Sequence, residues 1–440
     1  MSHDCRDQSE VALQLYHAVE LDDRGELTQL LTKGADLHYK YFGEKSLLHI
    51  CCEKDRLECA KLLMDYGANI QAQDEWNMTP LMYCMVRQLN DIAEELLSRD
   101  PLAVHSQDRF GKAAIHSAVE SGSPELLHLL LVHGVVTDQT DWGGMTALMS
   151  VCSRPGISHN VALCEMLLHA GADVNLKDLR SRRTALQYAS LNKLPAVVEV
   201  LLGAGADPNT FDTASRTPLT NLIYQTFRLQ NASRDVDEDL MTVVIMLTQA
   251  GANLNMNYRE NSNPVCKAAA YRVEALVRFF MDCGADPNTS FPLGVTSLLV
   301  AVKAKDAGCV RALLQWNART DIRGRVYRTA HTQYWVDPME LAVDLGCWDI
   351  VLLLYSAGYN ISRLPYLHEG VMDSELPESL LGNTEIMSWL LFLASSPRTL
   401  FHLTTLFVWR VLDKNFRQKI NDLPLPNMIK HFMSPEFVIG

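Results

Sequence analysis

The sequence lacks the features of a membrane or secreted protein. In its 440 residues no apolar run approaches the roughly 18 residues that a membrane-spanning helix needs. The opening Met1-Ser2-His3-Asp4-Cys5-Arg6 is polar, so no secretory signal peptide is expected. The 11 cysteines contain no C-x-x-C pair, and such a dispersed, odd set indicates reduced thiols buried as small apolar groups. A cytoplasmic location is predicted, with the nucleus as the alternative, and no membrane partner is expected.

Basic residues and catalytic motifs are also scarce. The chain has 39 Lys and Arg against 52 Asp and Glu, and its net charge of -13 argues against binding to the phosphate backbone of nucleic acids. The phosphate-loop signature G-x-x-x-x-G-K-[ST], the zinc-site signature H-E-x-x-H and the hydrolase signature G-x-S-x-G are all absent. We therefore expect no enzyme activity, no catalytic residue, no cofactor and no metal.

A short phrase does recur along most of the chain: two apolar residues, a few spacers, and then Gly-Ala-Asp or a near copy. Its clear copies are Gly34-Ala35-Asp36, Gly67-Ala68-Asn69, Gly171-Ala172-Asp173, Gly205-Ala206-Asp207, Gly251-Ala252-Asn253 and Gly284-Ala285-Asp286. Most successive copies, degraded ones included, lie 33 or 34 residues apart. Such a period indicates a solenoid of stacked repeats, because one copy cannot bury its apolar face alone.

A second phrase follows most of these glycines and begins with Thr or Ser. It reads Ser46-Leu47-Leu48-His49, Thr79-Pro80-Leu81-Met82, Thr146-Ala147-Leu148-Met149, Thr184-Ala185-Leu186-Gln187 and Thr217-Pro218-Leu219-Thr220. Thr or Ser caps a helix start, and Pro suits the first helical position. These residues resemble the ankyrin signature T-P-L-H-x-A. The resemblance covers residues 11–361 and implies an all-α ankyrin-repeat solenoid of about ten helix-turn-helix repeats with β-turn tips.

Two kinds of residue in the repeats invite a functional interpretation. His49 and His116 occupy the His position of the signature, which favours hydrogen-bonded structural histidines over ligands or bases. Aromatic residues stand at the tips between early repeats: Phe42, Trp76, Phe110 and Trp142. Aromatic residues are enriched at interfaces, so we predict that these four contact a protein substrate. The alternative is that each ring lies back on its neighbouring tip and only stiffens the stack.

An insertion and a change of composition mark the second half of the chain. The insertion Arg323–Trp335 is basic and aromatic, and is either part of a binding face or tolerated surface length. After Gly358 the sequence predicts a linker or irregular cap and a helix over about Glu385–Leu393. Between Leu400 and Leu412, nine of thirteen residues are large and apolar, so this predicted helix needs cover on two or more sides.

The run Leu423-Pro424-Leu425-Pro426 follows that helix and fixes an extended segment. Together the two stretches resemble the SOCS box, a small helical domain. Its first helix has a small residue and Leu, then Cys, then an aliphatic residue, which here are Thr399-Leu400, Thr404 in place of the usual Cys, and Val408. The whole chain resembles the ankyrin repeat and SOCS box family.

The family resemblance implies specific partners. It implies that Leu400, Leu403, Thr404 and Val408 dock on elongin C of the elongin B/C pair. It also implies that Leu423, Pro424, Leu425 and Pro426 lie against cullin-5, which carries its RING protein. The implied domains are an N-terminal tail (1–10), the ankyrin repeat domain (11–361), a linker and capping helix (362–395) and the SOCS box (396–440).

The implied function is that of a non-catalytic substrate-recognition adaptor of a cullin-5 RING ubiquitin ligase. In this reading the repeats bind an unidentified protein substrate for ubiquitination and proteasomal degradation. The alternative is an ankyrin-repeat interaction scaffold in which the C-terminal helices only cap the solenoid.

Overall fold

The chain forms two compact units. The computed structural model describes residues 4–229, 236–256, 263–291, 293–327, 333–367, 376–381 and 384–395. The first unit comprises the described residues of Met1–Leu222 and Asp237–Ala252, and the second those of Ile223–Val236 and Asn253–Gly440. Within the described residues, no helix is long and apolar enough to cross a membrane.

Ten consecutive helix pairs occur in the described residues, as the repeat pattern predicts. The pairs of the first unit are α1 (Asp4–Glu20) and α2 (Arg24–Thr32), α3 (Leu47–Lys54) and α4 (Leu57–Asp65), α5 (Pro80–Arg87) and α6 (Asn90–Arg99), α7 (Ala114–Ser121) and α8 (Pro124–Val132), α9 (Ala147–Ser153) and α10 (Asn160–His169), and α11 (Ala185–Leu191) and α12 (Pro195–Gly203). Short 3-10 turns are η1 (Phe42–Glu44) and η2 (Pro101–His105). Helix α1 thus includes most of the segment 1–10 that the sequence predicts as a tail. Helix α13 (Pro218–Leu229) crosses the boundary between the units, and α14 (Glu238–Gln249) lies in the first.

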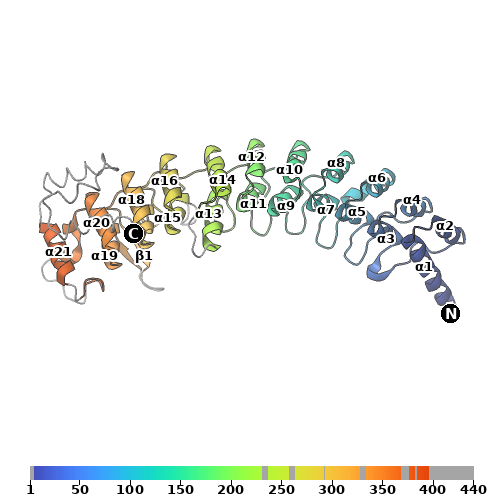
Figure 1. Cartoon of the computed structure of the whole chain (residues 1–440), viewed down its shortest axis with the longest axis horizontal. Helices are drawn as coiled ribbons and strands as arrows, with labels where there is room; N and C mark the ends of the chain where they lie inside the picture. Colours follow the sequence, from blue (N-terminus) through green and yellow to red (C-terminus); the bar gives the residue numbers. More distant parts are fainter. Residues whose placement is uncertain are drawn as a thin grey trace. The chain divides into compact units, whose positions relative to one another are not determined.

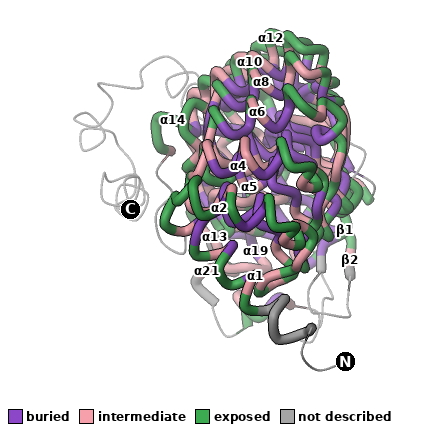
Figure 2. The backbone as a smooth tube through the Cα atoms, turned by 90° about the vertical axis from the view of Figure 1, so that its right-hand side faces the viewer, coloured by how far each residue is buried: buried purple, intermediate pink, exposed green. Residues whose placement is uncertain are grey.

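The helices of the first unit stack in two rows. Helices α3, α5, α7, α9 and α11 contact one another in series, and so do α4, α6, α8, α10, α12 and α14 (Figure 1). In α6 the residues Ile92, Ala93, Leu96 and Leu97 are buried, which is one face of a helix with 3.6 residues per turn. Buried residues line the inward-facing sides of the helices, and exposed residues lie on the outer turns (Figure 2). The core therefore runs between the two rows.

Capping residues start and end these helices where the sequence predicts. The Thr79 side chain accepts a hydrogen bond from the Met82 N–H at 3.4 Å, and Pro80 occupies the first helical position of α5. Gly67 and Gly171 follow α4 and α10 at φ +87° and +88°, a left-handed conformation that a Cβ disfavours. Eight of the ten cysteines from Cys51 to Cys347 are buried, as small apolar groups in the core would be.

The second unit repeats the architecture and adds a hairpin. Its elements are α15 (Pro264–Ala270), α16 (Glu274–Asp282), α17 (Ser297–Lys303), α18 (Ala307–Gln315), β1 (Gly324–Tyr327), β2 (Gln333–Val336), α19 (Pro338–Asp344), α20 (Trp348–Ser356), η3 (Ile361–Arg363), η4 (Pro365–Leu367) and α21 (Thr384–Ser395). Strands β1 and β2 pair antiparallel, from Gly324 with Val336 to Tyr327 with Gln333. The helix predicted over Glu385–Leu393 is observed as α21, which contacts η3 and η4.

Candidate protein-binding surface

Loops connect successive helix pairs of the first unit, and each contains a tight turn. We call the first five of these turns the tip row: 41–45, 74–78, 108–112, 141–145 and 178–183. In the second turn, Oδ1 of Asp74 accepts hydrogen bonds from the N–H groups of Trp76 and Met78, each at 2.8 Å. The next three turns are closed in the same way by Asp108, Asp141 and Asp178. A local carboxylate therefore fixes the shape of these four tips.

Backbone hydrogen bonds join each tip to the next. The donors and acceptors are Glu75 N–H to Gly43 O (2.9 Å), Arg109 N–H to Trp76 O (2.8 Å), Trp142 N–H to Phe110 O (3.0 Å) and Leu179 N–H to Gly143 O (2.9 Å). Because each tip is bonded to its neighbour, the backbone positions that carry the exposed side chains are held at a fixed spacing. A backbone that is already ordered loses little freedom when a partner binds.

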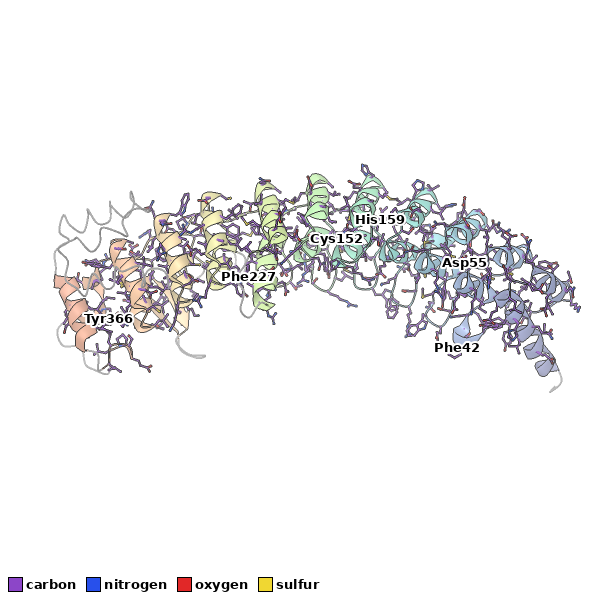
Figure 3. All side chains as sticks on the ribbon, viewed as in Figure 1. Phe42, Asp55, Cys152, His159, Phe227 and Tyr366 are labelled. Atoms are coloured by element: carbon purple, nitrogen blue, oxygen red, sulfur yellow. The ribbon has the colours of Figure 1, made fainter. Side chains whose placement is uncertain are left out.

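The four predicted aromatic residues all lie on the tip row and are all exposed. Phe42, Trp76, Phe110 and Trp142 expose 95%, 45%, 54% and 71% of their surface. The rings of Trp76 and Phe110 stack, with centroids 6.3 Å apart and planes 19° apart. Phe42 lies at the outer edge of its loop (Figure 3). Both sequence interpretations therefore apply: Trp76 and Phe110 lie on each other and Trp142 lies on Gly111 of the preceding tip, yet each ring keeps a large exposed surface. Substrate contact by the four remains a prediction.

Glycines make room for the side chain of the following tip. A Cβ on Gly111 would lie 2.4 Å from Cδ1 of Trp142, so the indole lies directly over this glycine. A Cβ on Gly144 would lie 2.6 Å from Cγ of Leu179. Leu179 exposes 75% of its surface and is a fifth exposed apolar side chain of the tip row, which was not predicted from the sequence. Its signal was its place directly after Asp178, as Trp142 follows Asp141.

Three exposed arginines of the tip row have no carboxylate partner among the residues that the structure describes. They are Arg109, Arg180 and Arg182, and no ion pair of theirs occurs within the described ranges. The guanidinium of Arg109 lies over the rings of Trp76 and Phe110, at 4.6 Å and 5.9 Å from their centroids. Nε of Arg180 lies 3.3 Å from the place of a Cβ on Gly143. These positive groups therefore lie among the exposed apolar side chains of the tip row.

The other cations of the same turns are paired. Lys45 binds Glu53 and Lys112 binds Glu120, both at 2.7 Å. Arg183 lies 3.8 Å from the buried carboxylate of Asp212. At the first two tips the exposed charges are instead negative, on Glu44 and Glu75. The unpaired charge of the tip row therefore changes sign along its length.

A buried histidine ties α3 to the tip row. Nδ1 of His49 accepts a hydrogen bond from the Ser46 N–H at 3.1 Å, and its Nε2 lies 2.9 Å from the carbonyl oxygen of Met78. Since Nδ1 accepts, the proton lies on Nε2 and is donated to that carbonyl, so a neutral ring makes both bonds. Burial lowers the pKa of His49 to about 4, which keeps the ring neutral.

The same pair of hydrogen bonds, which we call the clamp, recurs in two later repeats. His116 accepts from the Ala113 N–H at 3.1 Å and lies 3.0 Å from the Met145 carbonyl. Burial lowers its pKa as well. Gln187 makes the equivalent bonds through its amide, accepting from Thr184 N–H at 3.2 Å and donating to the Arg216 carbonyl at 3.0 Å. The prediction of structural histidines is confirmed by this geometry.

The predicted docking residues of the C-terminal region lie outside the described residues. They are Leu400, Leu403, Thr404, Val408, Leu423, Pro424, Leu425 and Pro426. Their roles therefore remain predictions. In the described ranges, no group of three or more His, Cys, Asp or Glu side chains could hold a metal ion.

Comparison with known families assigns most of the repeat region and the C-terminal region. Residues 15–108 and 91–178 match "Ankyrin repeats (3 copies)", and residues 181–213 match "Ankyrin repeat". Residues 396–434 match "SOCS box". The ankyrin matches include the first four tips of the tip row and all of the fifth except Leu179 and Arg180.

Curated relatives match the chain over part of its length. It is 30% identical over 167 residues to "Ankyrin repeat and SOCS box protein 16" of Mus musculus, which covers 37% of this chain and 36% of the relative. It is 28% identical over 219 residues to the "B-cell lymphoma 3 protein homolog" of Mus musculus, covering 48% of this chain and 44% of the relative. The "Nuclear factor NF-kappa-B p105 subunit" of Gallus gallus is 29% identical over 129 residues, covering 29% of this chain and 13% of the relative. The matches thus span less than half of each relative.

Solved structures of ankyrin repeat domains are similar to about half of the chain. The ankyrin repeat domain of Bcl-3 is 23% identical, covering 53% of this chain and 97% of that one with a TM-score of 0.45. The ankyrin repeat domain of human ASB11 is 22% identical, covering 53% of this chain and 96% of that one with a TM-score of 0.43.

Proposed function

The chain belongs to the ankyrin repeat and SOCS box family, and from this membership we propose that it is the substrate-recognition subunit of a cullin-5 RING ubiquitin ligase. The observation that carries the proposal is the SOCS box match at residues 396–434, which follows ten helix pairs. In this proposal the repeats bind a protein substrate, and the SOCS box recruits elongin B/C and cullin-5 with its RING protein. The chain itself contributes no catalytic group.

The proposed mechanism is proximity. A substrate held on the repeats presents its lysines at high effective concentration to a conjugating enzyme bound to the same assembly. Rigid positioning favours this mechanism, because a flexible attachment would spread the substrate over a larger volume. The hydrogen-bonded tips of the first unit provide such a rigid attachment surface.

Residues of the SOCS box would divide the recruitment between two partners. Leu400, Leu403 and Val408 would insert their apolar side chains into elongin C, which gives the apolar predicted helix the cover that it needs. Thr404 is close to Cys in size, and its hydroxyl can bond back to the Leu400 carbonyl within a helix. Leu423, Pro424, Leu425 and Pro426 would lie against cullin-5, with little loss of chain entropy because the prolines fix the backbone.

The scaffold alternative gives the C-terminal helices only a capping role. The described residues already provide a cap to the second unit: Leu364 and Leu390 are fully buried, and the Ser379 hydroxyl donates to the Val343 carbonyl of α19 at 2.5 Å. A solenoid end that is covered by η3, η4 and α21 has less need of residues 396–440 for the same purpose. This favours the receptor proposal.

Co-purification with elongin B/C tests the proposal. The full chain is expected to retain elongin B/C and cullin-5, and Leu400→Asp is expected to lose both because a carboxylate cannot enter an apolar pocket. Leu391→Asp is the matched control, since Leu391 is an exposed apolar residue of α21. Alanines at 423–426 should lose cullin-5 alone. A wild-type chain that never retains elongin B/C would leave the scaffold as the better description.

A further inference from the structure

We propose that the tip row binds an extended, acidic segment of the substrate protein, with apolar side chains of that segment on the exposed rings and its carboxylates on the unpaired arginines. The inference rests on the proposed function and deepens it by naming a substrate class. Three features of the tip row lead to it: the apolar anchors, the unpaired cations and the change of sign.

The anchors recur once per repeat. Phe42, Trp76, Phe110, Trp142 and Leu179 give each of the five tips one exposed apolar side chain. Regularly spaced exposed apolar side chains on a rigid backbone are suited to a partner in an extended conformation, which can reach each anchor in turn. Aromatic side chains of this kind carry much of the energy at protein interfaces.

The unpaired cations specify carboxylates. Arg109, Arg180 and Arg182 have no carboxylate partner within the described part of the chain, whereas Lys45, Lys112 and Arg183 are paired with acids. A guanidinium presents five N–H donors in a planar fork, which suits a carboxylate in a two-point contact. Neighbouring aromatic surface reduces the exposure of such a contact to water and strengthens it.

The change of sign gives the bound segment a direction. Glu44 and Glu75 at the first two tips repel acids, whereas Arg109, Arg180 and Arg182 at the third and fifth tips attract them. The acidic residues of the partner should therefore lie at the end that meets the third to fifth tips. A nucleic acid fits less well, because its evenly spaced phosphates would face Glu44 and Glu75, on a chain of net charge -13.

Selection from a displayed library of random peptides tests the inference. The full chain, co-purified with elongin B/C, is immobilised, and enriched peptides are measured by fluorescence anisotropy as fluorescein conjugates. We expect enriched peptides with apolar or aromatic residues along their length and Asp or Glu gathered at one end. A peptide with its sequence reversed should bind more weakly.

Charge reversal in the tip row provides the decisive variant. Arg180→Glu combined with Arg182→Glu should weaken binding at least tenfold, because two attractive contacts become repulsive. Lys33→Glu is the control for a charge reversal elsewhere on the surface, since Lys33 is exposed and lies outside the tip row. Trp142→Ala should weaken binding to a similar degree, with Val132→Ala on the exposed side of α8 as its control. Both arginines are exposed, so the double variant should fold normally.

Each outcome decides one of the two proposals. Three results would overturn the acidic-segment inference. They are enriched peptides that lack Asp and Glu, an equal loss of peptide affinity in the Lys33→Glu control, and tighter binding to a single-stranded oligonucleotide than to any peptide. If elongin B/C is retained while peptide binding fails, only the inference falls. If an acidic peptide binds the tip row but elongin B/C is not retained, the ligase proposal falls and the peptide surface stands.

Discussion

An arginine lies beside an exposed tryptophan in both units of the chain, but its surroundings differ. In the first unit, Arg109 lies over the face of Trp76 and no described carboxylate pairs with it. In the second unit, Arg323 donates to the carbonyl of Trp335 at 2.9 Å and to the carboxylate of Glu340 at 2.8 Å. Arg325 also bonds the preceding loop, from its N–H to the Leu293 carbonyl at 2.9 Å, so the backbone connection between tips is common to both units.

The comparison separates two uses of an arginine in the loops between helix pairs. Where the arginine is paired within the chain, as at Arg323, it fastens a hairpin to the helix that follows. Where it is left on an aromatic face, as at Arg109, it remains able to bind a carboxylate of another molecule. The backbone alone therefore does not determine which loops can serve as a binding surface. What determines it is whether the charged side chains of the loop are paired within the chain.

Gly111→Ala is expected to have the largest effect on the common backbone of the tips. At φ +79° a side chain is strained, and the added Cβ would lie 2.4 Å from Cδ1 and 2.8 Å from the backbone N of Trp142. The backbone nitrogen cannot move without breaking the bond to the Phe110 carbonyl, so we expect a loss of about 2–4 kcal/mol in unfolding free energy. Urea denaturation followed by circular dichroism measures it.

Gly34→Ala is the control for strain without crowding. Gly34 has φ +85° and no atom within 4 Å of the added Cβ, so the expected loss is only about 1 kcal/mol. Equal losses of unfolding free energy in the two glycine variants would mean that contact between tips adds nothing to stability. The tip row could then not be described as rigid.

The histidine clamp predicts a dependence of stability on pH. The pKa of His49 falls from 6.5 to about 4 on folding because burial disfavours the charged ring. As the pH falls, His49 therefore takes up a proton in the unfolded chain before it does so in the folded chain. The stability that the clamp contributes is fully present above pH 6.5 and is lost as the pH falls toward 4. This pKa shift corresponds to a loss of roughly 3 kcal/mol in the free energy of unfolding at the acid end of this pH range.

His49→Gln should flatten this dependence, because Gln187 makes the same two bonds without a titrating group. The measurement is the melting temperature of both proteins between neutral pH and pH 5, where the wild type should lose more than the variant. His116 is unchanged in both and contributes equally to each curve. Parallel curves would contradict a neutral clamp at His49.

The helix pairs and the exposed tips could be predicted from the sequence because they depend on local signals. The Thr-Pro-Leu phrase caps a helix at Thr79, and the glycine at Gly67 ends one, each within a few residues of the feature it fixes. The aromatic residues of the tips are exposed because the turns that carry them project from the stacked helices. The clamp of His49 followed from its position in the repeat signature.

The pairing of charges could not be predicted in this way. Arg183 meets Asp212, about one repeat further along the chain, and Arg323 meets Glu340 only because β1 and β2 fold into a hairpin. The insertion Arg323–Trp335 was left open as a binding face or surface length, and nothing in its sequence specified this hairpin. Leu179 was overlooked because an exposed leucine carries no signal apart from its place after Asp178.

Arg323→Ala should cost more stability than Arg182→Ala. Removal of Arg323 leaves the buried Glu340 carboxylate without its cation, and because Arg323 itself is half exposed we expect about 1 kcal/mol. Arg182 has no described carboxylate partner, so its loss should change stability by less than about 0.5 kcal/mol. Thermal melts of the two variants measure the difference. A larger loss for Arg182→Ala would mean that its charge serves the fold rather than a partner.

Arg109→Ala tests the comparison where the expected change in stability is small, because Arg109 has both a contact within the chain and a proposed contact with a partner. Its cation–π contacts with Trp76 and Phe110 are exposed, so their loss should lower stability by only about 0.5–1 kcal/mol. Arg109→Lys keeps the charge but loses the planar fork, and should recover part of the stability and little of the binding to an acidic peptide. Melting temperature and peptide anisotropy, measured on the same two variants, separate these effects. If both variants lost stability and kept full peptide affinity, Arg109 would belong with Arg323 as a structural residue, and the carboxylate contacts of the tip row would rest on Arg180 and Arg182 alone.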